Sequence, residues 1–256
     1  MKNVLLTISY NGTEFQGWQI QENCRTVQGE LQKVLSEVCD QEMKVNGTSR
    51  TDSGVHALGQ RATFSGDFGI PVHKLKMVVN RLLPNDIKIE AVEEVPMDFH
   101  ARFQAVGKQY VYKIRHGEER NVFFQNFYCH IDSLLNTSAM MEGATSFVGT
   151  HDFKGFMARG SNLQGTTVRT IFSFKVQEIS ENEVFLIIKG NGFLYNMVRI
   201  MAGTLIDVGQ GKVHPSNIGA IIESRERKCA GKTAPPQGLY LAKVYYDVSE
   251  LQKNDE

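Results

Sequence analysis

The chain has 256 residues, 41% of them hydrophobic and 22% charged, which is enough for one large globular domain or two smaller ones. Lysine plus arginine and aspartate plus glutamate both number 28. A nucleic-acid-binding protein of this composition would need its basic residues gathered on one face. No apolar run approaches the ~20 residues of a membrane-spanning helix, and the first residues become polar too soon for a signal peptide.

The cysteine and histidine patterns indicate neither a disulfide framework nor a metal site. Cys24, Cys39, Cys129 and Cys229 are far apart and form no CxxC pair. This usage is typical of reduced thiols in a cytosolic protein. The histidines and carboxylates show no metal-ligand spacing such as HExxH, so we expect no structural metal. We therefore expect a cytoplasmic globular protein.

The first hundred residues alternate between strand and helix patterns. Period-two alternation and β-rich composition predict strands at Lys2–Tyr10, Glu42–Val45, Gln60–Phe64 and Ile87–Val95. Helical spacing of apolar residues predicts helices at 27–39, after Thr26 as the N-cap, and at Val72–Leu83. Between the first strand and helix, we expect the aromatic side chains of Phe15–Gln19 to pack on the sheet. The order β-α-β-β-α-β is that of a split βαβ unit with its helices on one face.

The second half contains the same kinds of element. The patterns predict strands at Lys108–His116, Val168–Ile179, Glu183–Lys189 and Gly238–Val248, and helices at Ser133–Phe147, Tyr195–Val208 and Pro215–Ser224. A polar stretch at Arg159–Thr166 is typical of a mobile loop. We therefore expect an α+β fold with two similar ferredoxin-like halves, at 1–105 and 106–248, and a polar tail at 249–256. Their antiparallel sheets are expected to join, with helices outside and an active-site cleft at the junction.

Several segments begin like catalytic motifs but lack essential residues. Gly190–Tyr195 starts as GxGxxG without the last glycine, and Gly211-Lys212 lacks the other residues of a P-loop. His151 and Asp152 are adjacent and would point apart on a strand, so we interpret them as a capped turn.

The most informative stretch is the polar loop Asn46–Ala57, which lies between two predicted strands. It carries Arg50 two residues before Asp52, followed by Ser-Gly and a histidine. Asp-Ser-Gly is ordinary turn chemistry, because aspartate bonds its own backbone and glycine allows a positive φ. An Arg-x-Asp pair on a rigid loop is also a way to present a carboxylate to a substrate and keep it ionised. Composition alone leaves both interpretations open.

A second candidate is Arg199, which lies in the nearly all-apolar segment Tyr195–Gly203. An arginine in such a helix is rarely buried without a partner. It either reaches the surface or pairs with a carboxylate, and Asp52 lies in the loop best suited to a cleft. Lys108–His116 adds a third feature, because Tyr110 and Tyr112 share one face of that predicted strand and charged residues share the other.

Six ordered segments of the chain resemble the tRNA pseudouridine synthase A family. They span nearly the whole sequence: Ser49–Ala57, Phe99–Phe103, Lys108–Tyr112, His151–Phe153, Asn196–Arg199 and Ala234–Leu239. The first of them, with its RTD-x-GVHA pattern, is highly specific. Ser49 and Ser53 stand where the family usually has glycine and alanine. Both are small, so the loop should still form.

The resemblance implies a role for each candidate residue. Asp52 would be the nucleophile that attacks the target uridine, either at the uracil ring or at the ribose C1′. The N-glycosidic bond would break, the uracil would turn, and its C5 would bond to C1′. Tyr110 would stack on the base and is a candidate to handle the C5 proton, while Arg199 would pair with Asp52. Arg50 and Arg102 would assist base flipping and hold the RNA.

The resemblance also implies the substrate and the assembly. The family acts on uridines at positions 38, 39 and 40, on the 3′ side of the tRNA anticodon stem-loop, as a homodimer and without cofactor or metal. The residue roles and the RNA substrate that the resemblance implies agree with independent physical arguments. A bidentate arginine lowers the pKa of a nucleophilic carboxylate, and aromatic rings stack on any base. Scattered lysines and arginines can hold the phosphates of RNA, so a neutral chain is compatible with RNA binding.

Three other functions remain as alternatives. A non-catalytic RNA-binding protein on the same scaffold would lose Asp52 or Arg199, and this chain keeps both. A nucleoside hydrolase or glycosylase would need a base that activates water beside the nucleophile, and none is evident. A pure interaction domain offers no explanation for the Arg50–Asp52 loop together with Arg199. We therefore expect an RNA uridine isomerase.

Overall fold

The computed structural model describes residues 1–160 and 165–252 and divides into two compact units. The first contains Met1–Val106 and Tyr240–Asp247, and the second contains Gly107–Leu239 and Val248–Glu256. The sequence pattern had placed 240–247 in the second half. This segment belongs instead to the first unit, because β10 (Leu239–Tyr245) pairs in parallel with β3 (His56–Gly66). No helix in the described ranges is long and apolar enough to span a membrane.

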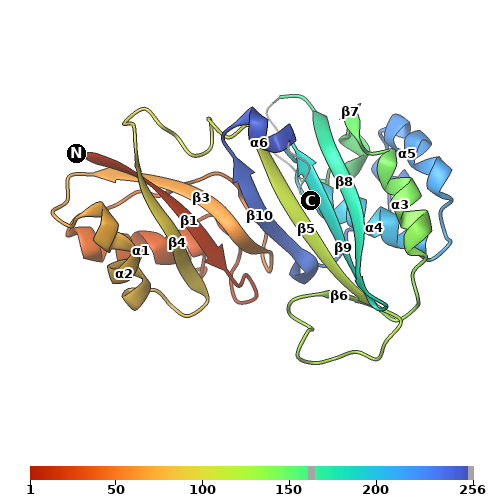
Figure 1. Ribbon diagram of the computed structural model, residues 1–256, viewed down its shortest axis with the longest axis horizontal. Coiled ribbons are helices and arrows are strands. Elements are labelled where there is room, and N and C mark those ends of the chain that lie inside the picture. Colours follow the sequence, from red (N-terminus) through yellow and green to blue (C-terminus); the bar gives the residue numbers. More distant parts are fainter. Residues whose placement is uncertain (161–164, 253–256) are drawn as a thin grey trace. The chain divides into compact units, whose positions relative to one another are not determined.

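The first unit is a mostly antiparallel sheet with two helices on one side (Figure 1). Besides β3 and β10, its elements are β1 (Lys2–Tyr10), α1 (Val27–Cys39), β2 (Asn46–Gly47), α2 (Val72–Leu82) and β4 (Ile87–Val95). β1 lies between β4 and β3 and is antiparallel to both, while the short β2 pairs with the other edge of β3. This is the strand order of a split βαβ unit, as predicted.

The core of the first unit follows from the alternation along β1. Val4, Leu6 and Ile8 point to one side of the sheet and are at most 1% exposed, which indicates burial under the helices. α1 begins where predicted, because the Thr26 side chain accepts a hydrogen bond from a first-turn amide. The aromatic loop after β1 packs inward, as expected, since Trp18 is 1% exposed.

One predicted strand of the first unit is absent, because residues 42–45 form no ladder. Side chains of α1 bond this backbone instead: Ser36 Oγ accepts from the amide of Met43 at 2.9 Å, and Gln32 Oε1 accepts from Val45 at 3.0 Å. Because side chains of α1 accept hydrogen bonds from these two backbone amides, strand pairing with β3 is limited to the two residues of β2. β3 in turn begins at His56, four residues earlier than predicted, which shortens the polar loop to 48–55.

The second unit also combines a mostly antiparallel sheet with helices. Its regular elements are β5 (Gly107–His116), β6 (Cys129–Ile131), α3 (Thr137–Thr145), β7 (Gly149–Asp152), β8 (Val168–Ser180), β9 (Glu183–Gly190), α4 (Met197–Gly209), α5 (Ile218–Ser224) and α6 (Val248–Gln252). The sheet order is β5-β9-β8-β7, and β6 adds in parallel to β5. The chain is thus an α+β protein, as the sequence predicts.

The helices of the second unit differ from the predicted ranges at their ends. α3 starts only after the Asn136 cap, and the predicted helix at 215 begins with one 3₁₀ turn before α5. The expected polar tail contains α6, whose Leu251 is 6% exposed because it packs on Gly107. Part of the predicted loop at 159–166 lies outside the described residues.

Candidate active site

The loop 48–55 carries Asp52 and is hydrogen-bonded to its surroundings on both sides. At its start, the amide of Thr48 donates to the carbonyl oxygen of Arg61 at 2.8 Å, and Thr48 Oγ1 donates to that of Ala101 at 3.0 Å. The next residue, Ser49, is bonded through both its amide and its carbonyl to the side chain of Gln60 on β3. The entry to the loop is therefore fixed in the first unit.

The segment 12–18, which follows β1, holds the other side of the loop. The amide of Trp18 donates to the carbonyl oxygen of Thr51 at 3.0 Å, and Ser53 Oγ donates to that of Phe15 at 3.2 Å. Gly17 has φ +87°, and a Cβ on it would lie 2.6 Å from the Thr51 carbonyl oxygen. Only glycine allows this approach. The backbone is thus held on both sides of Asp52.

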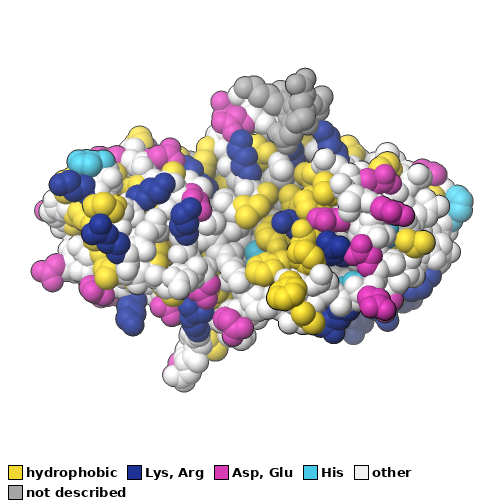
Figure 2. Space-filling view, turned by 60° about the horizontal axis from the view of Figure 1, so that its bottom comes forward, with side chains coloured by type: hydrophobic (Ala, Val, Ile, Leu, Met, Phe, Trp, Pro, Cys, Tyr) yellow, Lys and Arg dark blue, Asp and Glu magenta, His cyan; other side chains and the backbone are white. Residues whose placement is uncertain are grey.

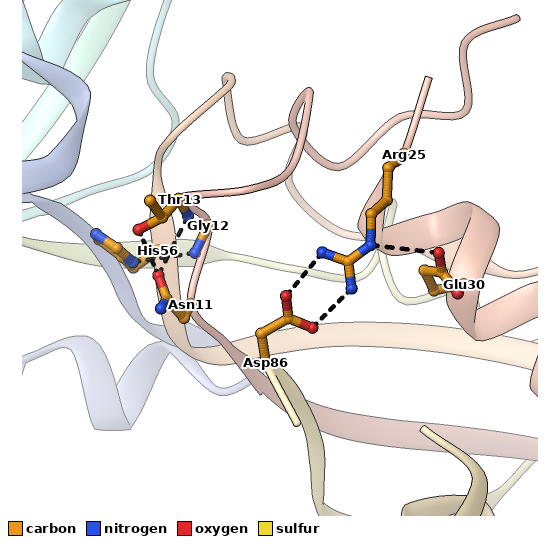
Figure 3. A network of polar contacts seen from close by, with 7 residues as sticks. All are labelled: Asn11, Gly12, Thr13, Arg25, Glu30, His56 and Asp86. Atoms are coloured by element: carbon orange, nitrogen blue, oxygen red, sulfur yellow. Dashed lines mark hydrogen bonds and ion pairs between the residues drawn. The ribbon is translucent and has the colours of Figure 1, made fainter. Parts of the chain in front are cut away.

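Figure 3 shows how the segment 12–18 is itself braced. The amide of Gly12 donates to Nδ1 of His56 at 3.0 Å. Farther along, the Arg25 guanidinium makes two hydrogen bonds to the Asp86 carboxylate, at 2.7 and 2.9 Å, and lies 4.1 Å from the centre of the Phe15 ring. The Asp86 contact raises the pKa of Arg25. Side chains from β3 and from the turn before β4 therefore support the segment 12–18, which contacts the loop.

Asp52 combines ordinary turn chemistry with partial exposure. Its carbonyl oxygen accepts from the amide of Val55 at 3.1 Å, and the residue is half-buried. Thr51 is buried, and its hydroxyl lies 2.7 Å from the Tyr10 hydroxyl. Arg50, on the other side of Thr51, is exposed. The interpretation in which Arg50 keeps this carboxylate ionised stays a prediction.

Arg102 lies close to the start of the same loop. Its neighbour Ala101 accepts hydrogen bonds from Thr48 Oγ1 and from the Tyr246 hydroxyl, the latter at 2.9 Å. Arg102 itself is exposed, as Arg50 is. The structure thus brings two exposed cations and one half-buried carboxylate into the first unit, in and beside the loop.

The two serines that depart from the family pattern have different environments. Ser53 contributes a loop bond through its hydroxyl, as described above. Ser49 is 4% exposed, and within the described part of the chain its Oγ has no hydrogen-bond partner. The loop forms with both serines, as the sequence predicted.

Tyr110 and Tyr112 point to the same face of β5, as predicted, but their environments differ. Tyr110 is 8% exposed and meets the Phe193 ring edge-on, with the ring centres 5.1 Å apart. Tyr112 is completely buried, and its hydroxyl donates to the carbonyl oxygen of Pro235 at 2.8 Å. Burial raises the pKa of Tyr112 well above its ordinary value. This environment favours a structural role for Tyr112.

Arg199 is half-buried on α4 and its guanidinium is held by neighbouring groups. Nε donates to the carbonyl oxygen of Ala234 at 2.7 Å, and one terminal nitrogen donates to Asn196 Oδ1 at 2.8 Å. The amide of Ala234 returns a bond to the carbonyl oxygen of Arg199 at 3.0 Å. The segment at 234–235 thus bonds both Arg199 and Tyr112 and links α4 to β5.

Several contacts of the loop and of Arg199 involve residues to which the sequence analysis gave no role. Gln60 on β3 bonds Ser49, His56 on β3 bonds Gly12, and Ala234 bonds Arg199. A polar side chain at an inward position of a strand, as at Gln60, is the one signal that could have indicated such a role. The predicted capped turn is confirmed for Asp152 alone, whose Oδ1 accepts from the amide of Lys154 at 3.1 Å, while His151 and Asp152 both lie in β7.

Asp52 lies in the first unit, whereas Tyr110 and Arg199 lie in the second. The contact between Asp52 and Arg199 therefore stays a prediction. In the described residues, no group of three or more histidine, cysteine, aspartate or glutamate side chains could hold a metal ion.

Comparison with known proteins identifies the family. A family model described as tRNA pseudouridine synthase matches residues 6–104 and 144–247. A protein named tRNA pseudouridine synthase A from Ruminiclostridium cellulolyticum is 48% identical over 246 residues, which cover 96% of this chain and all of that protein. Proteins of the same name from Acetivibrio thermocellus and Bacillus pumilus are 45% and 44% identical, and cover 96% and 95% of this chain and 100% and 99% of their own lengths.

This chain combines a two-unit α+β fold with an anchored aspartate loop, and its relatives place it in the class of RNA-modifying isomerases. The chain is a member of the tRNA pseudouridine synthase family.

Proposed function

We propose that this chain converts uridine to pseudouridine in tRNA, with Asp52 as the nucleophile. The observation that carries the proposal is the loop 48–55, whose backbone is bonded on both sides of Asp52 while the aspartate itself stays partly exposed. A rigid loop that presents a single carboxylate fits a covalent mechanism, because the nucleophile is held in place before substrate arrives. Family membership supplies the reaction.

The reaction is an isomerisation, so its atoms balance without a co-substrate. The carboxylate of Asp52 attacks the flipped uridine, at the uracil ring or at C1′, and the bond between N1 and C1′ breaks. The uracil turns, C5 bonds to C1′, and the bond between Asp52 and the substrate breaks, which restores the carboxylate. The proton on C5 leaves as N1 gains one. The uridine must leave the stack first, because its glycosidic bond is inaccessible inside a helix.

The other candidate residues have roles that their environments support. Tyr110 offers a ring for stacking on the base and a hydroxyl to handle the C5 proton. Arg199 is the proposed partner of Asp52, and its guanidinium is already oriented by Ala234 and Asn196. Arg50 and Arg102 are exposed cations beside the loop, which suits contacts to the RNA backbone.

The decisive experiment compares the wild-type protein with Asp52→Asn on unmodified tRNA. Pseudouridine is mapped after incubation, and tRNA binding is measured in parallel. We expect modification by the wild type, no turnover by Asp52→Asn, and nearly equal binding by both. Residual turnover above a few per cent would exclude Asp52 as the nucleophile. Binding without modification by the wild type would favour the non-catalytic RNA-binding alternative.

The target is proposed to be the uridines at positions 38–40 of the anticodon stem-loop, in the cytoplasm where tRNA is used. The test replaces each of these uridines by cytidine in turn and maps the remaining sites. Modification that persists elsewhere in the tRNA when all three are replaced would contradict this assignment.

We further propose a homodimer, and the second unit offers a surface for it. Large apolar side chains between β5 and β6 and just after β6 are at least 36% exposed: Val122, Phe123, Phe124, Phe127 and Leu134. We call these residues the β5–β6 apolar surface. Figure 2 shows hydrophobic side chains beside charged ones on the side where this segment projects in Figure 1. Such exposed apolar clusters are typical of interaction sites.

The homodimer is tested by measuring the mass of the protein in solution. Phe123 is 83% exposed, so Phe123→Ser should weaken the dimer without unfolding the chain. Phe103→Ser is the matched control, because Phe103 is 76% exposed in the first unit. A monomeric wild type would contradict the homodimer, and a dimeric Phe123→Ser variant would exclude this surface.

A further inference from the structure

We propose that Gln60 and His56, two buried side chains of β3, are positioning residues that hold the Asp52 loop from its two ends. The inference rests on the proposed function, because positioning matters only if Asp52 is the nucleophile. Neither residue needs to contact the substrate for this role. Both act through backbone groups of the segments that surround the loop.

At the start of the loop, the Gln60 side chain supplies the hydrogen bonds that the backbone of a neighbouring strand would otherwise make. Its side-chain Nε2 donates to the carbonyl oxygen of Ser49 at 2.6 Å, and its Oε1 accepts from the amide of Ser49 at 3.2 Å. The two bonds fix which atom of the side-chain amide is oxygen, because one partner is an acceptor and the other a donor. Gln60 is completely buried. A buried glutamine that satisfies both polar groups of one peptide residue fixes that residue's orientation, three positions before Asp52.

His56 supports the opposite side of the loop through Gly12. The His56 ring is 1% exposed and lies against Tyr240, with ring centres 4.6 Å apart. Its Nδ1 accepts from the amide of Gly12 at 3.0 Å, so this nitrogen carries no proton. A Cβ on Gly12 would lie 2.0 Å from the carbonyl oxygen of Val55. The histidine therefore holds a glycine that lies directly against the end of the loop (Figure 3).

These contacts act on the reaction through geometry. A nucleophile misplaced by about 1 Å can cost roughly 10²-fold in rate, even when the change lies away from the reacting atoms. Loss of either anchor should therefore lower kcat while the KM for tRNA changes little. A merely structural residue would lower the melting temperature without this division between kcat and KM.

The experiment uses pairs of variants that differ in one hydrogen-bonding atom. His56→Asn keeps an acceptor near the position of Nδ1, whereas His56→Gln extends its polar atoms beyond that position. Both lose the ring, so their difference isolates the bond to Gly12. Gln60→Met keeps the length of the side chain and removes both bonds, and Gln60→Glu keeps only the acceptor. His73→Gln, at an exposed position of α2, is the control.

Two readouts are measured for each variant well below its melting temperature. The first is kcat and KM on tRNA, and the second is hydrogen exchange of the loop amides 48–55 in the free protein. We expect His56→Gln and both Gln60 variants to lower kcat by roughly 10- to 100-fold and to speed loop exchange. His56→Asn should recover most of the loss, and His73→Gln should match the wild type.

The exchange readout does not depend on the identity of the nucleophile. Unchanged loop exchange and unchanged kcat in His56→Gln and Gln60→Met would overturn the positioning roles. Equal losses in His56→Asn and His56→Gln would show that only the ring matters. If loop exchange speeds up but Asp52→Asn keeps its turnover, the anchors are real and the proposed function of Asp52 is wrong.

Discussion

At the scale of single residues, we expect the two tyrosines of β5 to have different roles, Tyr110 in catalysis and Tyr112 in stability. Tyr110→Phe keeps the ring and its contact with Phe193, so tRNA binding should persist. Loss of the hydroxyl should slow turnover by roughly 10²–10⁴-fold if it handles the proton. Tyr112→Phe leaves the buried carbonyl of Pro235 without its donor and should cost about 1–3 kcal/mol of stability with little effect on turnover. Turnover and thermal unfolding of both variants test this, and a larger loss of turnover at Tyr112 would reverse the assignment.

Arg199 requires a double-mutant cycle with Asp52. Arg199→Ala would strip donors from Ala234 and Asn196 whether or not Asp52 is its partner, so the single variant decides nothing. Removing one member of a fully buried pair typically costs ~3–5 kcal/mol, so the cost at these two half-buried residues should be smaller. The double variant should be more stable than the two single costs added together. Arg199→Lys should rescue activity only partly, because lysine lacks the bidentate fork. Strict additivity in thermal unfolding would show that Arg199 serves another group.

At the scale of elements, close packing contributes more to the stability of α4 than helix propensity does. A Cβ on Gly203 would lie 1.8 Å from the carbonyl oxygen of Lys232, in the segment that leads to the Ala234 partner of Arg199. Gly203→Ala should therefore destabilise the protein by about 1–3 kcal/mol or more. In α5, by contrast, nothing lies within 4 Å of a Cβ on Gly219. Gly219→Ala should stabilise by about 0.5–1 kcal/mol. Equal effects in chemical unfolding would refute this reading of α4.

At the scale of the whole molecule, the chain returns to the first unit near its end. A chain that stops at Leu239 loses the partner of β3 in β10 and the Tyr246 hydroxyl, which bonds Ala101 beside the loop. A chain that stops at Asp247 keeps both and loses only α6 and the residues after it. We expect the shorter chain to lack a cooperative thermal transition and activity. The longer one should fold with reduced stability, because Leu251 no longer covers Gly107. Cooperative unfolding of the shorter chain would show that the first unit does not need β10.

The elements could be predicted from the sequence where local patterns decide them. β1, α1 and β4 start and end where alternation, helical spacing and the Thr26 cap indicate. The prediction fails at Glu42–Val45, where the composition suits a strand but side chains of α1 take the backbone bonds. That competition lies outside the segment itself, so its composition could not reveal it.

The sequence by itself determined most of the longer strands and helices, and it identified the Asp52 loop through a highly specific pattern. Both depend on residues that lie close together in the sequence. Only the tertiary structure decided what holds that loop, because its partners Gly12, Gln60 and Ala101 come from separate segments of the first unit. Only the tertiary structure, too, placed β10 in the first unit, since strand pairing is a non-local choice of backbone partners that the alternation along one strand cannot express.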